Sequence, residues 1–213
     1  MKKSLLAVLL AAALAAPVFA TEKGAINVDV KAGISLSQDL TYDISTMGTN
    51  RSISYDLETT FSLGADFLYY VDSNIAVGVG IDRIFNTKIK NDANGDPKDS
   101  KVGYTNIYFQ AKYDFVLNNN IFNNVYPILQ IGYGFLDDDL YSSPGVTYEK
   151  ENGLYWAIGA GATIKENFVV ELLYSVDYGK INATLPPGLG DIAFTTDLTC
   201  KILRLNVGYK FGF

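Results

Sequence analysis

Residues 203–213 read Leu-Arg-Leu-Asn-Val-Gly-Tyr-Lys-Phe-Gly-Phe, with an apolar or aromatic side chain at every odd position. The even positions hold arginine, asparagine, glycine, lysine and glycine. Successive side chains of a β-strand point to opposite faces, so this period of two indicates a strand. The stretch therefore predicts a strand with one apolar and one polar face.

The same alternation recurs seven more times along the chain. The segments are 26–37, 57–69, 75–82, 106–115, 125–135, 154–164 and 168–177. In each of them the polar face is rich in glycine and other small residues, which suits a confined interior better than an open surface. A soluble β-sandwich also alternates, but it does not require this composition.

The connections between these segments alternate in length. Those at 72–74, 118–124 and 165–167 are short, whereas those at 38–54, 88–101, 137–153 and 182–198 are long. Short turns at one rim and long loops at the other are typical of barrels that span the bacterial outer membrane, where closure satisfies every backbone hydrogen bond. The sequence therefore predicts an all-β fold: a transmembrane up-and-down antiparallel eight-stranded β-barrel with four extracellular loops.

Residues 1–20 have the features of a signal peptide. Lys2 and Lys3 precede an apolar run over residues 5–16, and Val18 and Ala20 fill the positions that the signal peptidase reads. The run is shorter than the roughly 20 residues that a membrane-spanning helix needs. We expect cleavage after Ala20, export through the periplasm, and a barrel domain over residues 21–213.

Composition excludes several classes of function. With 17 Lys+Arg against 23 Asp+Glu, the chain is too acidic for a nucleic-acid binder. Cys200 is the only cysteine, so no internal disulfide forms. There is no histidine, the usual base near neutral pH, and we expect no enzymatic activity. We also expect no cofactor or metal site, because Pro97 stands where a calcium loop starting at Asp92 needs glycine.

The last eight residues resemble the C-terminal insertion signal of bacterial outer-membrane proteins. Asn206, Gly208, Phe211 and Phe213 fill its polar, glycine and two aromatic positions. The strand–turn–strand over 61–79 and the stretch 126–134 are similar to segments of the small eight-stranded barrels, namely outer-membrane proteins A, X and W and the opacity proteins. This resemblance implies insertion by the barrel-assembly machinery, and contact with membrane lipid and lipopolysaccharide.

Several charged residues have the parity of the inward face. This expected lumen cluster comprises Lys31, Glu58, Asp66, Asp82, Lys112, Asp114, Glu171 and Arg204, with Asp29 and Lys210 at the same parity. An eight-stranded barrel is only wide enough for its own side chains to fill it, so these charges must pair or hydrate. We expect Arg204 to face Glu58 or Asp82, and Lys112 to lie near Asp66 or Asp114. The cluster would form a static plug or, alternatively, a gate.

Three functions remain open at this point. The first is a structural and surface-interaction protein with a polar, plugged lumen. The second is a narrow channel for small or hydrophobic molecules, as the resemblance to outer-membrane protein W suggests. The third, an enzyme acting on lipid, is the weakest because histidine is absent. The sequence names no extracellular ligand.

Overall fold

The computed structural model describes residues 22–46, 49–90, 101–117, 121–137, 147–165, 167–184 and 193–213. The predicted signal peptide and the loop that starts at Asp92 lie outside these ranges. No helix in the described ranges is long and apolar enough to cross a membrane.

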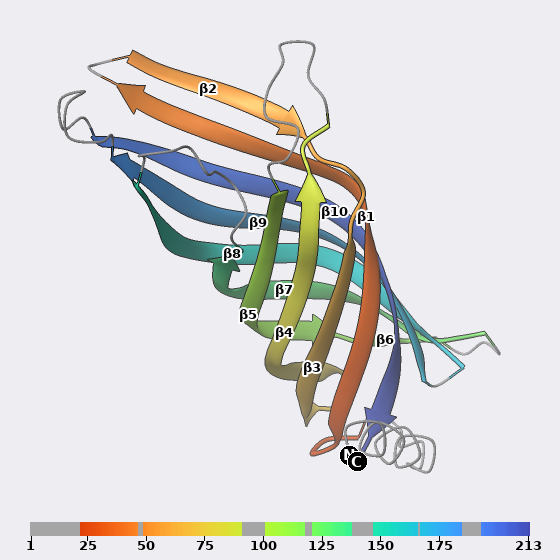
Figure 1. Ribbon diagram of the computed structural model, residues 1–213. Coiled ribbons are helices and arrows are strands. Elements are labelled where there is room, and N and C mark those ends of the chain that lie inside the picture. Colours follow the sequence, from red (N-terminus) through yellow and green to blue (C-terminus); the bar gives the residue numbers. More distant parts are fainter. Residues whose placement is uncertain are drawn as a thin grey trace, which may run out of the picture.

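Every regular element of the described chain is a β-strand (Figure 1). The strands are β1 (Ile26–Thr46), β2 (Thr49–Asp56), β3 (Phe61–Asp72), β4 (Ile75–Lys88), β5 (Lys101–Tyr113), β6 (Phe115–Val116), β7 (Phe122–Leu136), β8 (Thr147–Ile164), β9 (Phe168–Thr184) and β10 (Ala193–Gly212).

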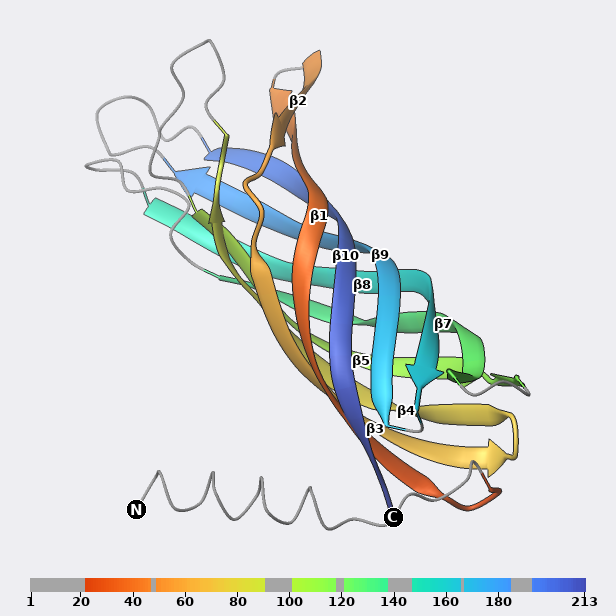
Figure 2. The same ribbon diagram turned by 90° about the vertical axis from the view of Figure 1, so that its right-hand side faces the viewer.

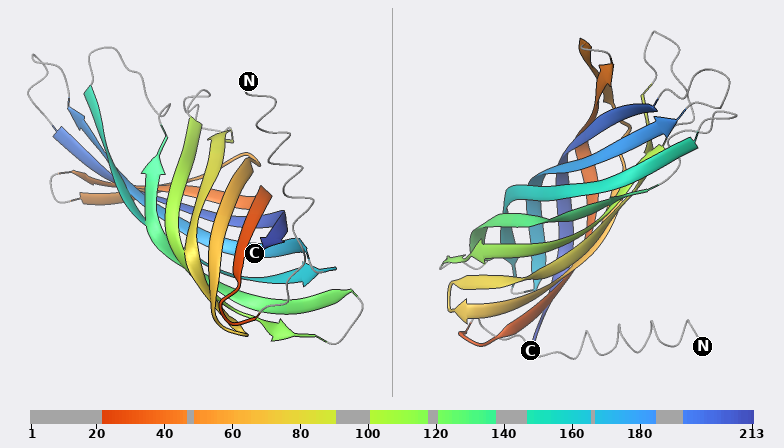
Figure 3. Two further views of the ribbon diagram at one scale, coloured as in Figure 1. Left: turned by 90° about the horizontal axis from the view of Figure 1, so that it is seen from below. Right: turned by 90° about the vertical axis from the view of Figure 1, so that its left-hand side faces the viewer.

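The hydrogen-bonded ladder closes into a ring. Strand β1 pairs with β3 on one side and with β10 on the other, and the remaining neighbours pair in the order β3, β4, β5, β7, β8, β9, β10. All of these pairs are antiparallel. The predicted all-β, up-and-down architecture is confirmed, and the strands of this ring wind obliquely around it (Figure 3).

Two short strands lie outside the ring of eight. Strand β2 pairs with the outer half of β1, from Asp39 to Thr46, in a region that was expected to be a loop. Strand β6 pairs with β7 just after the break at Asp114. Strand β2 precedes β3 and β6 follows β5 along the chain, each across a short break, so the eight-stranded closure is unchanged.

The end of the barrel with long connections carries a sheet that continues past the ring. There the neighbours β8, β9, β10, β1 and β2 remain paired, whereas β7 pairs with β8 only as far as Gly134 and Gly153 (Figures 1 and 2). We call this continuation the projecting sheet; it comprises residues 39–46, 49–56, 147–152, 179–184 and 193–201. Much of what was expected as loop is therefore strand.

The outward face of the ring is a band of exposed apolar side chains. Phe109 is 69 % exposed, and Ile131, Ile158 and Val207 are each more than half exposed. A soluble monomer does not leave such a continuous apolar band in water, whereas a membrane barrel needs one. Toward the projecting sheet the band ends, and Lys201 follows Leu203 as the next outward residue of β10.

Most inward-facing side chains belong to a polar zone or to a large apolar zone, and smaller apolar clusters, such as that of Leu68, Tyr70 and Ala76, lie elsewhere in the interior. The polar zone fills the barrel at the level of the apolar band. Beyond it lies the apolar cluster, formed by Leu40, Tyr42, Leu57, Ile84, Val102, Tyr104, Leu136, Ile181, Leu198, Cys200 and Ile202. A bulge between Ser35 and Ser37 changes which residues of β1 face inward, from odd numbers up to Ser35 to even numbers from Gln38.

Candidate functional site: the charged interior

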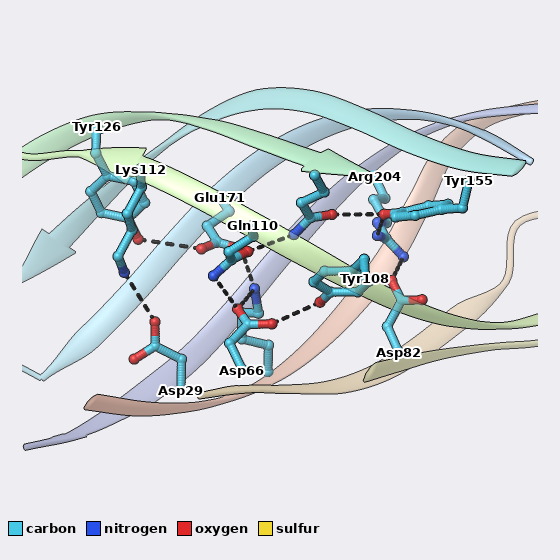
Figure 4. A network of polar contacts seen from close by, with 12 residues as sticks. Asp29, Asp66, Asp82, Tyr108, Gln110, Lys112, Tyr126, Tyr155, Glu171 and Arg204 are labelled. Atoms are coloured by element: carbon cyan, nitrogen blue, oxygen red, sulfur yellow. Dashed lines mark hydrogen bonds and ion pairs between the residues drawn. The ribbon is translucent and has the colours of Figure 1, made fainter. Parts of the chain in front are cut away.

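Alternation along eight strands brings charged and amide side chains from the whole ring to one level of the interior. We call the connected set the interior network; its members are Asp29, Lys31, Asp66, Asp82, Tyr108, Gln110, Lys112, Tyr126, Gln130, Tyr155, Glu171 and Arg204 (Figure 4). Each of these residues is at most 5 % exposed. The network therefore lies out of contact with bulk water.

Lys31 is the central cation of the network. Its Nζ atom lies 2.5 Å from Asp66 Oδ2 and 2.8 Å from Glu171 Oε2, which joins strands β1, β3 and β9 across the barrel. Gly208 of the neighbouring strand makes room for it, because a Cβ atom there would approach Lys31 Cγ to 2.7 Å and the carbonyl oxygen of Val30 to 2.6 Å. The glycine therefore permits the lysine stem to run along the wall.

A chain of hydrogen bonds leads from Asp66 to the opposite wall. Tyr108 donates its hydroxyl to Asp66 Oδ1 at 2.7 Å, and Gln110 donates Nε2 to Asp66 Oδ2 at 3.0 Å. The chain then passes from Gln110 to Gln130 at 2.8 Å and from Gln130 to the hydroxyl of Tyr155 at 2.7 Å. Side chains from several strands are thus tied together at one level (Figure 4).

Arg204 ends this chain on β10. Its guanidinium forms an ion pair with Asp82 and donates to the Tyr155 hydroxyl at 2.8 Å. Asp82 is one of the two partners expected from the sequence. The other, Glu58, is exposed, and the expectation that it faces the lumen is wrong.

The reason for this error is a break in the strand. Strand β2 ends at Asp56 and β3 begins at Phe61, so the alternation of β3 does not continue back through residues 57–60. Leu57 turns inward instead and is 2 % exposed, while Glu58 takes the outward side. Alternate residues share a face only along an extended strand, so this rule fails wherever the backbone leaves the extended conformation.

The second cation, Lys112, lies near enough to Asp66 and Asp114 to interact with their charges, as expected, but its ion pair is with Asp29, which was not expected. Its Nζ atom lies 3.2 Å from Asp29 Oδ2 and 4.7 Å from the centroid of the Tyr126 ring. Asp114 instead accepts a 2.7 Å hydrogen bond from the hydroxyl of Tyr70. Alternation along a strand predicts which side chains face inward. It does not predict which of them meet across the barrel, because that depends on how far neighbouring strands are shifted relative to one another.

Three carboxylates of the network come close enough together to surround a cation. One oxygen each from Asp29, Asp66 and Glu171 lie within 4.8 Å of one another. The ammonium groups of Lys31 and Lys112 already bind these acids. The positive charge at this place is therefore supplied by lysine side chains.

Sequence reasoning placed the tyrosines and glutamines of the network on the inward face but gave them no role. Tyr108, Tyr126 and Tyr155 each donate or accept a hydrogen bond with a charged partner. Their positions in the sequence could have indicated a role, because they are long polar side chains that alternate onto the inward face beside charged residues. In a closed interior such groups must hydrogen-bond across the lumen, because a buried unsatisfied polar atom is costly.

The four residues of the expected insertion signal divide between the two faces of β10. Asn206 is 5 % exposed and faces the interior, whereas Phe213 is 64 % exposed. The Phe211 ring packs at a tilt of 49° against Tyr209 with centroids 4.7 Å apart, and Tyr209 in turn packs edge-on against Phe168. This aromatic group lies at the short-turn end, where interfacial aromatic girdles occur.

A closed antiparallel ring with an apolar outer band and a charged, paired interior defines an integral outer-membrane β-barrel protein. The chain belongs to the family described as "Outer membrane protein beta-barrel domain", whose model matches residues 5–211. It is accordingly a protein of the bacterial outer membrane. No curated protein is similar enough in sequence to match it.

Several solved outer-membrane proteins are similar over nearly the whole chain, among them OprG and AlkL. The outer membrane protein OprG from Pseudomonas aeruginosa has a TM-score of 0.63 at 17 % identity, covering 90 % of this chain and 97 % of OprG. The outer membrane protein AlkL, solved by solid-state NMR in lipid bilayers, has a TM-score of 0.54 at 15 % identity, covering 90 % of this chain and 91 % of AlkL. At these identities the likeness shows the fold.

Proposed function

We propose that this protein is a structural, surface-presenting barrel whose interior is closed by the interior network. The observation that carries the proposal is an unbroken set of contacts that crosses the lumen. It runs from Arg204 through Tyr155, Gln130 and Gln110 to Asp66 and Lys31. Ion passage requires a continuous polar path of sufficient width. Side chains that are hydrogen-bonded to each other across the lumen occupy that path.

The projecting sheet supports the surface role. Its outward face carries a transverse row of charges, because Asp43 is opposite Asp197, Asp197 is opposite Lys180, and Lys180 is opposite Glu151. All four are exposed, and only Lys180 is cationic. We infer that this face contacts molecules outside the cell, and that the apolar band of the ring contacts the lipid and lipopolysaccharide of the outer membrane. We also infer that the barrel-assembly machinery inserts the chain.

Single-channel recording of the purified protein in planar bilayers tests the closed lumen. We expect no steady conductance from the wild type. We expect Arg204→Ala to be nearly non-conducting as well. The hydrogen bonds from Tyr108 and Gln110 to Asp66, and from Gln130 to Gln110, remain in that variant. Steady wild-type conductance would contradict the proposal and favour a gate.

A second candidate function rests on the apolar cluster. Toward the long-loop end the interior is lined by Leu40, Ile84, Leu198 and Ile202, each at most 1 % exposed. An interior of this kind suits small apolar molecules, which would enter without carrying current. A conduit for such molecules is therefore the alternative, and it is independent of ion conductance.

Partitioning of a small apolar fluorescent probe into vesicles that contain the protein distinguishes the alternative. If the apolar cluster forms the route, Ile202→Thr will slow transfer, while Ile107→Thr on the outward face will not. Equal transfer with and without protein leaves the surface role as the only one supported. Faster transfer that responds to Ile202→Thr alone would make the conduit the main function.

A further inference from the structure

Two lysines face each other across neighbouring strands at the long-connection end of the ring. Lys88, the last residue of β4, is opposite Lys101, the first residue of β5, and we call them the lysine pair. The adjacent residues Thr87 and Val102 are also opposite each other and are buried in the interior, so both lysines point outward. Like charges directly opposite each other in a sheet are destabilising. Such a pair is unexpected in a chain with 17 Lys+Arg against 23 Asp+Glu.

The lysine pair has no acidic partner among the described residues. The backbone nitrogen of Glu58 donates to the carbonyl oxygen of Lys88 at 2.9 Å, but the carboxylate of Glu58 forms no ion pair with it. The next outward cation toward the membrane, Arg83, is by contrast ion-paired with Asp137. Within the part of the chain that the structure describes, the two lysine charges are therefore available to a partner.

The lysine pair lies at the depth of the lipid headgroups. On β4 the outward side chains run from Ile81 in the apolar band through Arg83 and Phe85 to Lys88. Phe85 is 43 % exposed and has the position of an interfacial aromatic residue. Lys88 is three residues further on, about 10 Å along the strand and about 7–8 Å in height at the usual tilt. The headgroup layer is about 5–7 Å thick, so the flexible lysine side chains reach it.

The charge and the depth together indicate the partner. The outer leaflet of this membrane contains lipopolysaccharide, whose lipid A anchor carries phosphate groups on its sugar headgroup. A lysine ammonium binds phosphate as a point charge, and clustered lysines at a membrane surface attract anionic headgroups. We propose that the lysine pair binds a phosphate group of lipopolysaccharide in the outer leaflet. The inference rests on the contact with lipopolysaccharide proposed above and assigns a site to it. The bound phosphate offsets the repulsion between the two ammonium groups.

Binding of purified lipid A tests the site. The folded protein in detergent micelles with EDTA is titrated with lipid A that carries two phosphates, and bound lipid A is counted by native mass spectrometry. Dephosphorylated lipid A has the same acyl chains and is the matched ligand without the charge. We expect the phosphorylated form to bind more tightly, by about fivefold for each lysine that contacts the headgroup.

Variants that remove charge locate the effect. Lys88→Gln and Lys101→Gln should each lower the affinity for phosphorylated lipid A about fivefold, and the double variant should bind both forms of lipid A equally. The double variant removes a repulsion, so without lipid A its thermal unfolding midpoint should be no lower than that of the wild type. Lys180→Gln is the matched control, because Lys180 is an outward lysine that already lies 3.5 Å from Asp197. It should leave the affinity unchanged.

Thermal unfolding gives a second measurement. Phosphorylated lipid A should raise the midpoint of the wild type more than that of the double variant, because a ligand that binds only the native state stabilises it. Equal affinities of the wild type and the double variant would overturn the site but not the general contact with lipopolysaccharide. If the wild type binds neither form of lipid A, that contact is contradicted too. Displacement of lipid A by millimolar inorganic phosphate would indicate a site for the free anion and would also overturn the proposal.

Discussion

On β10, Arg204 and Ile202 are successive inward residues, yet one lies in the interior network and the other in the apolar cluster. Their outward neighbours change in the opposite sense, from Leu203 beside Arg204 to Lys201 beside Ile202. At the level of Arg204 the barrel is apolar outside and polar inside. Two residues further on it is polar outside and apolar inside, as in a soluble protein.

The difference shows that the surrounding medium determines which face is apolar. Within lipid, outward side chains must be apolar, and the polar groups of the chain are directed into the lumen, where they satisfy one another. In water beyond the membrane the hydrophobic effect favours the reverse arrangement. On β10 the boundary between lipid and water lies at Ile202 and Leu203, two apolar residues in succession. Leu203 faces outward and Ile202 inward, so the apolar side chains move from the outer to the inner face here although the strand itself is unbroken.

The largest effect is expected from removing the central cation of the polar zone. Lys31→Ala leaves Asp66 and Glu171 without their buried partner, which costs about 3–5 kcal/mol of unfolding free energy. Lys180→Ala is the matched control, because its 3.5 Å pair with Asp197 is exposed to water and contributes at most about 1 kcal/mol. Urea unfolding in lipid vesicles measures both. Equal losses would remove the energetic distinction between the interior and the projecting sheet.

The next effect concerns the outward face. Ile158→Arg places a charge in the apolar band, where a barrel loses about 2–4 kcal/mol at mid-bilayer depth. Thr195→Arg places the same side chain on the outward face of the projecting sheet and should change stability little. If both variants lose the same free energy, the boundary between lipid and water does not lie between these two positions.

A smaller effect is expected within the apolar cluster. Ile84→Val removes one methylene group from a side chain that is 1 % exposed and should cost about 0.5–1.5 kcal/mol. Ile107→Val makes the same change on the outward face, where lipid fills the space left, and should cost less. Thermal unfolding in detergent compares the two. A larger loss for Ile107→Val would mean that the cluster is loosely packed.

The smallest effect on the folded barrel is expected at the predicted insertion signal. The backbone of Phe213 closes the ladder with Ile26, at 2.8 Å and 3.2 Å, so Phe213→Ser preserves those hydrogen bonds. Its unfolding free energy should change little, while the assembled fraction in cells should fall. Heat-modifiable gel mobility measures assembly, with Phe168→Ser as an exposed aromatic control at the same end. Normal assembly of Phe213→Ser would remove the evidence for a signal.

The closed all-β ring, and the face of most strands that points inward, could be predicted from the sequence. Period-two alternation is a local property of a strand, so it can be recognised without knowing which strands are its neighbours. Alternation alone predicts that four charged residues face inward: Lys31, Asp66, Lys112 and Arg204. Glu58 does not follow the predicted parity, because the chain leaves the extended strand conformation between β2 and β3. The sequence likewise predicts loops in the region of the projecting sheet, because pairing between distant segments such as β1 and β10 leaves little mark in local composition.

The partners of these inward side chains could not be predicted from the sequence, because they follow from the fold of the whole chain. That Lys112 pairs with Asp29, that Lys31 bridges Asp66 and Glu171, and that Asp177 meets Asn106 over Gly134 all depend on the stagger of strands around the ring. Strand alternation specifies a direction from the wall, whereas a contact across the lumen needs the height of each residue along the barrel axis. That height is set by the closure of β1 onto β10, a property of the whole chain and not of any segment.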